Sequence, residues 1–146
     1  MRQKELRIAL VCYGGISLAV YMHGVTKEVW HLVRASCQFH REGGQKSLGL
    51  SPTAKIYLEL LERIEAERGL RLRGLSDILA GASAGGINAL FLAEAVHSGG
   101  SLEPLTDMWL AEADTDRLLD PTALRSFSRV LDIGCGAGEI SIALAT

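Results

Sequence analysis

Paired cysteines are missing from this sequence, and their absence argues against a metal site. The three cysteines, Cys12, Cys37 and Cys135, are widely spaced and form no Cys-x-x-Cys pair. Free thiols in a reducing compartment are the simplest interpretation. We therefore expect a cytoplasmic protein that uses neither a metal ion nor another cofactor.

A basic stripe and a long uninterrupted apolar segment are also missing. The 15 Lys and Arg residues are balanced by 17 Asp and Glu residues, and no stretch gathers the cations that a nucleic-acid duplex would need, so nucleic acid is not an expected partner. The apolar run over 78–96 is interrupted by glycines, Asn88 and Glu94, and the run near the start is interrupted by Gly14 and Gly15. We predict neither a membrane span nor a signal peptide.

The residues that are present suffice for one packed domain. Hydrophobic residues make up 48% of the 146 and charged residues 22%, which is too apolar for intrinsic disorder. Short apolar runs, glycine turns and helical periodicities alternate along the chain and predict a layered α/β fold. The expected elements are a strand over 6–12, a helix over 16–33, an exposed loop over 36–50, a helix from Ser51-Pro52 to Gly69 with an apolar stripe at Ile56, Leu60, Leu61 and Ile64, a strand over 75–81, and helices over 85–96 and 101–112.

A Gly-x-Ser-x-Gly pattern lies between a predicted strand and a predicted helix, at Gly81-Ala82-Ser83-Ala84-Gly85. Glycines two positions before and after the serine permit a sharp turn that projects the hydroxyl from the sheet edge. The free N–H groups at the start of the helix also favour an oxyanion there. Ser83 is therefore the candidate nucleophile, and the plainer alternative is a tight turn in which Ser83 is only a helix cap.

A second glycine turn, Tyr13-Gly14-Gly15-Ile16, follows the first predicted strand. In an α/β sheet, turns at the carboxyl ends of neighbouring strands can meet. The backbone N–H groups of Gly14, Gly15 and Ile16, together with that of Ala84, would then form an oxyanion hole beside Ser83. The alternative interpretation is a phosphate-binding or purely steric turn.

These two turns carry a resemblance to a known family. The runs RIALVCYGGISLAVYMHGV and DILAGASAGGINALFLAEA, followed by Asp107-Met108-Trp109-Leu110, resemble the start of a bacterial patatin-like protein over about residues 5–120. The resemblance implies a three-layer αβα fold, incomplete here, over 1–120. It also implies a Ser-Asp dyad and hydrolysis of acyl esters in phospholipids or neutral lipids, with peripheral membrane contact.

The oxyanion loop departs from the family pattern Asp-Gly-Gly-Gly-x-Arg-Gly. Tyr13 stands for the Asp, Ile16 for the third Gly, Leu18 for the Arg and Ala19 for the last Gly. Backbone donors survive these changes, whereas a cationic contribution from the loop does not. The sequence resembles the Gly-Gly-Val-Ser-Leu-Ala variant of the loop found in one bacterial branch.

A base that could activate Ser83 is not apparent. In the patatin-like family the base is an Asp in an Asp-Gly turn, and this sequence has no Asp-Gly dipeptide. The four histidines, His23, His31, His40 and His97, are expected on the surface or on helix faces, and we assign no catalytic role to Asp107, Asp114, Asp116 or Asp120. We therefore expect little esterase or phospholipase activity, and a catalytically silent fragment that binds lipid or a partner stays open as an alternative.

The tail over 121–146 carries a second resemblance. Residues 129–145, with the turn Gly134-x-Gly136-x-Gly138, are similar to the first motif of class I S-adenosylmethionine-dependent methyltransferases. Such folds need an acidic residue about 20 residues further on to hold the ribose, and the sequence ends at Thr146. We expect at most weak binding of this cofactor, although a methyltransferase remnant is the third interpretation of the chain.

Overall fold

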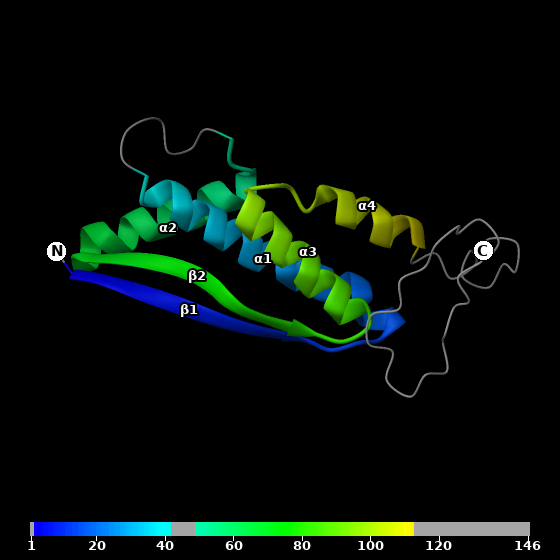
Figure 1. The fold of residues 1–146 in the computed structure, drawn as a ribbon. Coiled ribbons are helices and arrows are strands. Elements are labelled where there is room, and N and C mark those ends of the chain that lie inside the picture. Colours follow the sequence, from blue (N-terminus) through cyan, green and yellow to red (C-terminus); the bar gives the residue numbers. More distant parts are fainter. Residues whose placement is uncertain (1, 42–48, 113–146) are drawn as a thin grey trace, which may run out of the picture.

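Residues 2–41 and 49–112 are described by the computed structural model, and they form a mixed α/β arrangement (Figure 1). Along the chain the elements are β1 (Arg2–Cys12), α1 (Ile16–Phe39), α2 (Pro52–Arg68), β2 (Leu70–Gly81), α3 (Ala84–Ser98) and α4 (Glu103–Glu112). Within these two ranges, no helix has both the length and the hydropathy to cross a membrane. The α/β class predicted from the sequence is confirmed.

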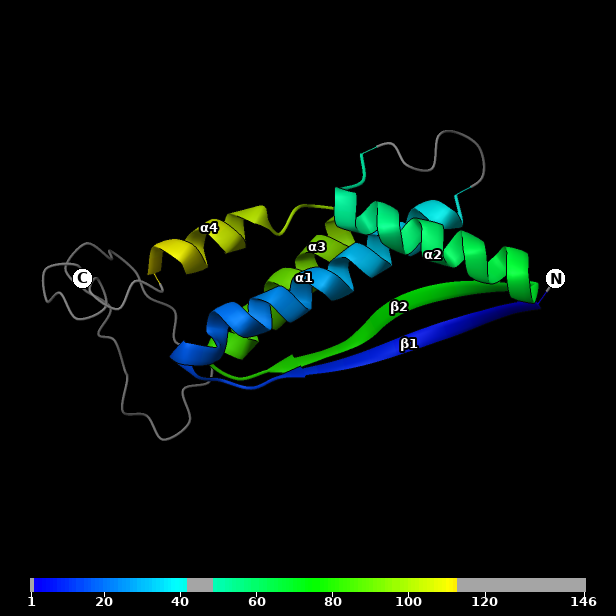
Figure 2. The ribbon, with the colours of Figure 1, turned by 180° about the vertical axis from the view of Figure 1, so that it is seen from behind.

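The two strands pair in parallel, from Arg2 with Leu70 to Cys12 with Gly81. Parallel neighbours need a crossover connection, which α1 and α2 provide. The described helices all lie on one side of this sheet, as the two opposite views show (Figures 1 and 2). The register shifts after Ile8, so that Asp77 has no partner in β1.

Both strands are longer than the sequence predicted. Strand β1 begins at Arg2 rather than at residue 6, and β2 begins at Leu70 rather than at residue 75. The added residues are charged or polar at many positions, and they pair with each other in the register of the ladder. A continuous apolar run indicates a strand that is buried on both faces. The charged and polar halves of these two strands lack such a run, so the sequence pattern did not predict them.

The predicted exposed loop over 36–50 is wrong for its first residues, because α1 continues to Phe39. Ser36 is buried, and its hydroxyl accepts a hydrogen bond from the N–H of Gly74 at 2.8 Å. Phe39 is fully buried in a cluster with Leu58 and Leu61. The polar sequence did not predict the last turns of the helix, because their burial depends on contacts with β2 and α2.

The helix predicted from Ser51-Pro52 to Gly69 is confirmed at both ends. The Ser51 hydroxyl accepts from the N–H of Ala54 at 3.2 Å, and Gly69 takes the left-handed conformation of a C-cap. The predicted apolar stripe is wrong in part, because Ile56 is 66% exposed and Leu60 is 47% exposed. Leu61 is buried as predicted, and the helix packs through it together with Ala54 and Leu58.

A second core cluster ties α1 to α3 and α4. It consists of Trp30, Leu92, Ala95, Leu102 and Leu105, with the strand residues Leu10 and Leu79 packed against it. Helix α3 ends at Gly99 in the left-handed conformation, and Leu105 of α4 is buried. These contacts hold the start of α3, and with it Ser83, against the carboxyl ends of the strands.

Candidate active site

Ser83 occupies a strained turn between β2 and α3. Its backbone has φ 53° and ψ −132°, and it is the one non-glycine residue with positive φ in the ranges that the structure describes. Such a conformation costs roughly 1–3 kcal/mol for a residue with a Cβ and persists only where the surroundings enforce it. The turn therefore has the backbone geometry of a nucleophile elbow rather than of an ordinary helix cap.

The two flanking glycines are required sterically. A Cβ at Gly81 would come within 2.5 Å of the carbonyl oxygen of Gly85, because the chain folds back on itself here. A Cβ at Gly85 would meet the carbonyl oxygens of Cys12 and Tyr13, the latter at 2.5 Å. Both distances are shorter than any real Cβ contact, so the Gly-x-Ser-x-Gly spacing reflects packing of the elbow against the end of β1.

The two glycine turns meet, as the sequence predicted. A Cβ at Gly14 would lie 2.8 Å from the Cβ of Ser83 and 2.9 Å from the carbonyl oxygen of Ala82. The N–H of Ala82 donates to the carbonyl of Cys12 at 3.1 Å, which fixes one turn against the other. Only a glycine at position 14 allows the Gly14-Gly15 backbone to approach the serine this closely.

Several backbone donors beside Ser83 are unused. In this part of the described chain, backbone hydrogen bonds engage the N–H groups of Leu18, Ala82, Gly85 and Ile87. They leave those of Gly14, Gly15 and Ala84 without a backbone acceptor among the described residues. Free N–H groups near a serine are what an oxyanion hole needs, and the helix dipole at the start of α3 acts in the same direction. Their roles in catalysis, and that of Ile16, stay predictions.

The hydroxyl of Ser83 makes no hydrogen bond with any residue that the structure describes. His97 lies fourteen positions further along α3, which places it about 20 Å away along the helix axis. His40 follows the last residue of α1, at the opposite end of that helix from Gly15. Neither histidine can accept the serine proton.

The other two histidines lie on faces of α1, within the prediction of surface or helix-face positions, and both are buried. His23 donates from Nε2 to the hydroxyl of Thr106 at 2.8 Å, and His31 shares a hydrogen bond of 3.0 Å with Ser51. Burial lowers the pKa of both imidazoles. They are buried because α4 and the start of α2 cover α1 at these positions, which sequence periodicity does not reveal.

Other groups near the elbow are unsuited to nucleophilic or base catalysis. Burial raises the pKa of the Cys12 thiol, so this residue remains a neutral thiol rather than a reactive thiolate. Asp77 pairs with Arg7 at 3.0 Å, six positions before Ser83 on the strand side. Asp107 is exposed on α4, and Asp114, Asp116 and Asp120 lie outside the described residues.

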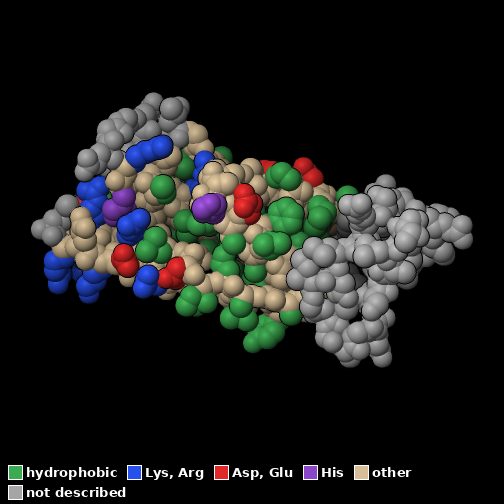
Figure 3. Space-filling model, viewed as in Figure 1, with side chains coloured by type: hydrophobic (Ala, Val, Ile, Leu, Met, Phe, Trp, Pro, Cys, Tyr) green, Lys and Arg blue, Asp and Glu red, His purple; other side chains and the backbone are tan. Residues whose placement is uncertain are grey.

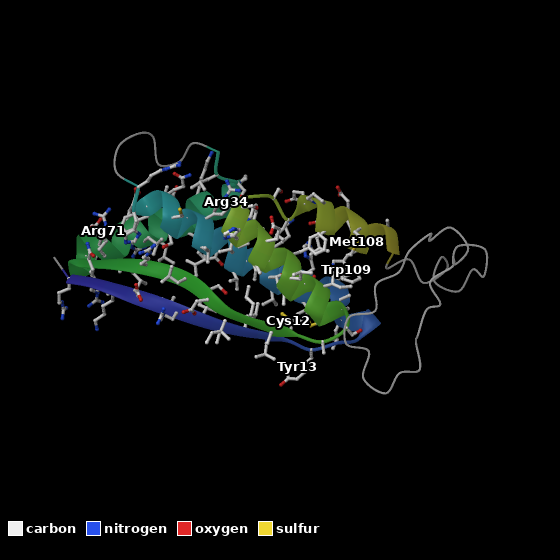
Figure 4. All side chains as sticks on the ribbon, in the orientation of Figure 1. Cys12, Tyr13, Arg34, Arg71, Met108 and Trp109 are labelled. Carbon is white, nitrogen blue, oxygen red and sulfur yellow. The ribbon has the colours of Figure 1, made fainter. Side chains whose placement is uncertain are left out.

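A groove of about 280 Å³ adjoins the glycine turn, and sequence reasoning did not identify it. Figure 4 shows Cys12 and Tyr13, two of its lining residues, where β1 ends. Tyr13 is 74% exposed and Tyr21 is 71% exposed, although the sequence pattern indicated only a helix with an apolar face at this point. The full lining is apolar apart from the tyrosine hydroxyls: Leu10, Val11, Cys12, Tyr13, Leu18, Tyr21, Met22 and Val25.

Two further predictions cannot be followed in the structure. The turn Gly134-x-Gly136-x-Gly138, together with the whole tail over 121–146, lies outside the described residues. Within 2–41 and 49–112, no group of three His, Cys, Asp or Glu side chains is arranged to hold a metal ion. Cys12 and Cys37 are free thiols, and Cys135 lies in the undescribed tail.

Comparison with known proteins gives one informative match. The chain is 38% identical over 125 residues to the "Uncharacterized membrane protein Rv3479" of Mycobacterium tuberculosis. The match covers 81% of this chain but 11% of the relative, so the chain spans about a tenth of the length of the curated protein it matches. No family model matches the chain, and no solved structure matches it.

Proposed function

We propose that this chain carries the nucleophile-bearing part of a serine lipid acyl hydrolase of the patatin-like type. The observation that carries the proposal is the strained backbone of Ser83, φ 53°, against which Gly14 packs. A fold does not maintain such a turn for stability, since a helix can begin from an unstrained cap at lower cost. A partly exposed serine beside N–H groups without a backbone acceptor among the described residues suits attack on an ester carbonyl.

The bare face of the sheet supports an incomplete three-layer αβα domain. Parallel strands are normally covered on both faces, because crossover helices pack on each side. Here the described helices cover one face, and Val11 and Ile78 are 57% and 59% exposed. A second helical layer over these side chains would complete the layered architecture of the patatin-like type.

The apolar groove supports a lipid as substrate. Its lining residues begin directly before Gly14 and continue on α1, with Leu18 about 3.7 Å from the position a Gly15 Cβ would take. An acyl chain in this groove would bring its ester carbonyl to the glycine turn and Ser83. The relative is named a membrane protein, which agrees with a protein that contacts a membrane peripherally from the cytoplasm.

In the proposed reaction, the Ser83 oxygen attacks the ester carbon and the carbonyl becomes an oxyanion held by the N–H groups of Gly14, Gly15 and Ala84. The bond to the alcohol breaks, the alcohol leaves with a proton, and water then hydrolyses the acyl-serine to the acid. A base must accept the serine proton at the first step. The described residues present no such base to the hydroxyl, so we expect turnover by residues 1–146 to stay close to the uncatalysed rate.

A fluorophosphonate probe tests the nucleophile separately from turnover. We expect slow labelling of the folded chain at Ser83 that is lost on denaturation and in Ser83→Ala. Ser98→Ala is the matched control, because Ser98 ends the same helix and donates to the carbonyl of Glu94 at 2.8 Å. Labelling that survives in Ser83→Ala, or no labelling at all, would contradict the proposal.

An ester assay distinguishes a hydrolase that lacks a base from a protein that is not a hydrolase. We expect p-nitrophenyl ester turnover near background for the unchanged chain and for Ser83→Ala alike. Turnover at ordinary enzymatic rates that Ser83→Ala abolishes would show that a base is present, and Asp107 would be tested first. Binding of a fatty acid in the groove without any probe labelling would instead favour a catalytically silent lipid-binding module.

A further inference from the structure

A second cavity lies at the other end of the strands, and its lining is charged rather than apolar. It encloses about 270 Å³ and is lined by Gln3, Lys4, Glu5, His40, Arg71 and Arg73. Figure 4 shows Arg71 at the end of the sheet opposite Cys12 and Tyr13. Basic side chains gather over this end of the molecule, whereas hydrophobic side chains cover the part nearer the elbow (Figure 3).

The cavity concentrates positive charge that nearby carboxylates only partly balance. Lys4 and Arg73 form no ion pair with any described residue, and Arg71 lies 3.6 Å from Glu65. Glu5 is the one carboxylate in the lining, and Arg7, which lies outside it, is 3.7 Å from Glu5. With Glu5 in the lining and Glu65 beside Arg71, the three cations still leave net positive charge, which a bound anion would offset.

Two of the lining residues are held in place by the protein. The Arg71 guanidinium donates to the carbonyl of Phe39 at 3.1 Å and lies 5.0 Å above the Phe39 ring. His40 donates from Nδ1 to the carbonyl of Ser36 at 2.9 Å, which fixes the orientation of its ring beside the cavity. A site whose donors are already oriented loses less entropy when it binds an anion.

The distance along the strands separates this cavity from the candidate active site. Lys4 and Cys12 are eight residues apart on β1, which corresponds to about 26 Å at the rise of a strand. The phosphate of a glycerophospholipid lies only a few bonds from its acyl esters. One lipid molecule therefore cannot place its ester at Ser83 and its phosphate among Lys4, Arg71 and Arg73.

We propose that this cavity is a phosphate-binding site, independent of the hydrolase function. The ligand is a phosphate group with at least three free oxygens, carried either by a monoester lipid headgroup at a membrane surface or by a free phosphate. Guanidinium groups match the geometry of phosphate oxygens, and the lysine adds a compact charge. The Gln3 amide supplies a neutral donor to the same space.

Titration of the full chain with inorganic phosphate at constant ionic strength tests the site. We expect saturable shifts of the amide resonances of residues 71–73 and of the Arg71 side chain. Arg73→Gln should weaken binding about tenfold or more, the loss expected for one charge-assisted hydrogen bond. Lys4→Gln, together with Arg73→Gln, should abolish saturation, and both residues are exposed, so the fold should tolerate the changes.

Arg63→Gln is the matched control, because Arg63 is exposed on α2 and pairs with Glu67 at 2.7 Å. It removes the same charge at a distance from the cavity, and we expect phosphate binding to change less than twofold. Non-saturable shifts, or equal weakening by Arg63→Gln and Arg73→Gln, would overturn the proposal. In either case the labelling test of Ser83 is unaffected.

Vesicles identify the source of the phosphate. If a lipid supplies it, the chain should sediment with phosphatidylcholine vesicles that contain phosphatidic acid, and not with phosphatidylcholine alone, and Arg73→Gln should abolish sedimentation. If free phosphate is the ligand, saturable binding of inorganic phosphate is retained and the vesicles leave the chain in solution. Sedimentation that Arg73→Gln does not change would exclude the lipid arm.

Discussion

The hydroxyl of Ser83 and the polar groups buried between the helices differ in their hydrogen bonding. Asn88, five residues further along α3 and fully buried, donates to the carbonyl of Ala19 at 3.1 Å and accepts from the indole N–H of Trp109 at 2.8 Å. The hydroxyl of Ser83 has no hydrogen-bond partner among the described residues, and the backbone of Ser83 is strained. One group stabilises the fold, and the other is maintained at a cost.

This difference distinguishes Asn88, a polar residue that stabilises the fold, from Ser83, the candidate functional residue. Most buried polar groups in proteins are hydrogen-bonded, and a buried group without a partner calls for an explanation. Three buried side-chain atoms of the described residues lack a partner, His23 Nδ1, Trp30 Nε1 and Ser76 Oγ. None of them lies in a strained turn, so Ser83 differs from them in backbone as well as in hydrogen bonding.

The largest expected effect is at Asn88. Asn88→Ala removes both hydrogen bonds, leaves the Trp109 indole without its partner and opens a cavity between α1, α3 and α4. We expect the free energy of unfolding to fall by about 3 kcal/mol in urea denaturation. Ser98→Ala in the same helix, where the hydroxyl is exposed, should change it by less than about 0.5 kcal/mol.

Equal small effects at Asn88 and Ser98 would break the comparison, because they would mean that Asn88 is no more structural than an exposed serine. Probe labelling of Ser83 gives an independent reading. In Asn88→Ala it should decline in proportion to the unfolded fraction, since the substitution leaves the elbow sequence intact. Full labelling of an unfolded chain would instead indicate that the turn does not activate the serine.

Local glycine geometry was predictable from the sequence, whereas burial by distant elements was not. The turns at Gly14-Gly15 and at Gly81 to Gly85 follow strands, and the sterics that require glycine operate over a few residues. The Gly69 and Gly99 helix ends were predictable for the same reason. Such signals depend on the backbone conformation within one turn, so they do not change with the elements that pack around the turn.

The missed features all depend on tertiary contacts. Ser36 is buried by Gly74, and His23 by Thr106, across separations of 38 and 83 residues. The groove exists because apolar residues on one face of α1 remain exposed beside β1, although their spacing equally fits a buried helix face. The absence of an Asp-Gly dipeptide was visible in the sequence, whereas the separation of His40 and His97 from Ser83 was not.

The next effect concerns Ser83 itself and has the opposite sign. Ser83→Gly relieves the strain of positive φ, roughly 1–3 kcal/mol, and is offset by about 0.5–1 kcal/mol of added chain entropy. We expect the free energy of unfolding to rise by about 1 kcal/mol in urea denaturation. Ser83→Ala keeps a Cβ and therefore the strain, so its stability should match that of the unchanged chain.

Both variants lose the nucleophile, so together they separate strain from chemistry. A stability gain in Ser83→Gly without one in Ser83→Ala would show that the fold maintains a strained residue at this turn. If both variants are less stable than the unchanged chain, the Ser83 side chain contributes to stability, and the contrast with Asn88 disappears.

The smallest expected effect is a pH dependence of the free energy of unfolding, which involves the unpartnered nitrogen of His23. The Thr106 hydroxyl donates to the carbonyl of Leu102 at 3.3 Å, so it accepts from Nε2–H of His23, and Nδ1 is the unprotonated, buried nitrogen. Protonation would place an N–H donor there with no acceptor. Burial first, and then the charge of Lys27, lower the pKa of His23 below its ordinary value of 6.5, against the opposing effect of Glu103.

A lowered pKa in the folded state means that the unfolded chain binds the proton first. The stabilising contribution is therefore complete above pH 6.5 and is lost as the pH falls below 6.5 toward the folded-state pKa. The free energy of unfolding, measured in urea at pH 7.5, 6.5 and 5.5, should show this decline. His23→Gln should reduce the dependence of that free energy on pH. Part of the dependence that remains should arise from His31, because burial lowers its pKa as well. His97→Gln, at an exposed position, is the matched control and should leave the slope unchanged. If His23→Gln and His97→Gln give the same slope, His23 is not the group that couples protonation to unfolding, and its lone Nδ1 is tolerated for another reason.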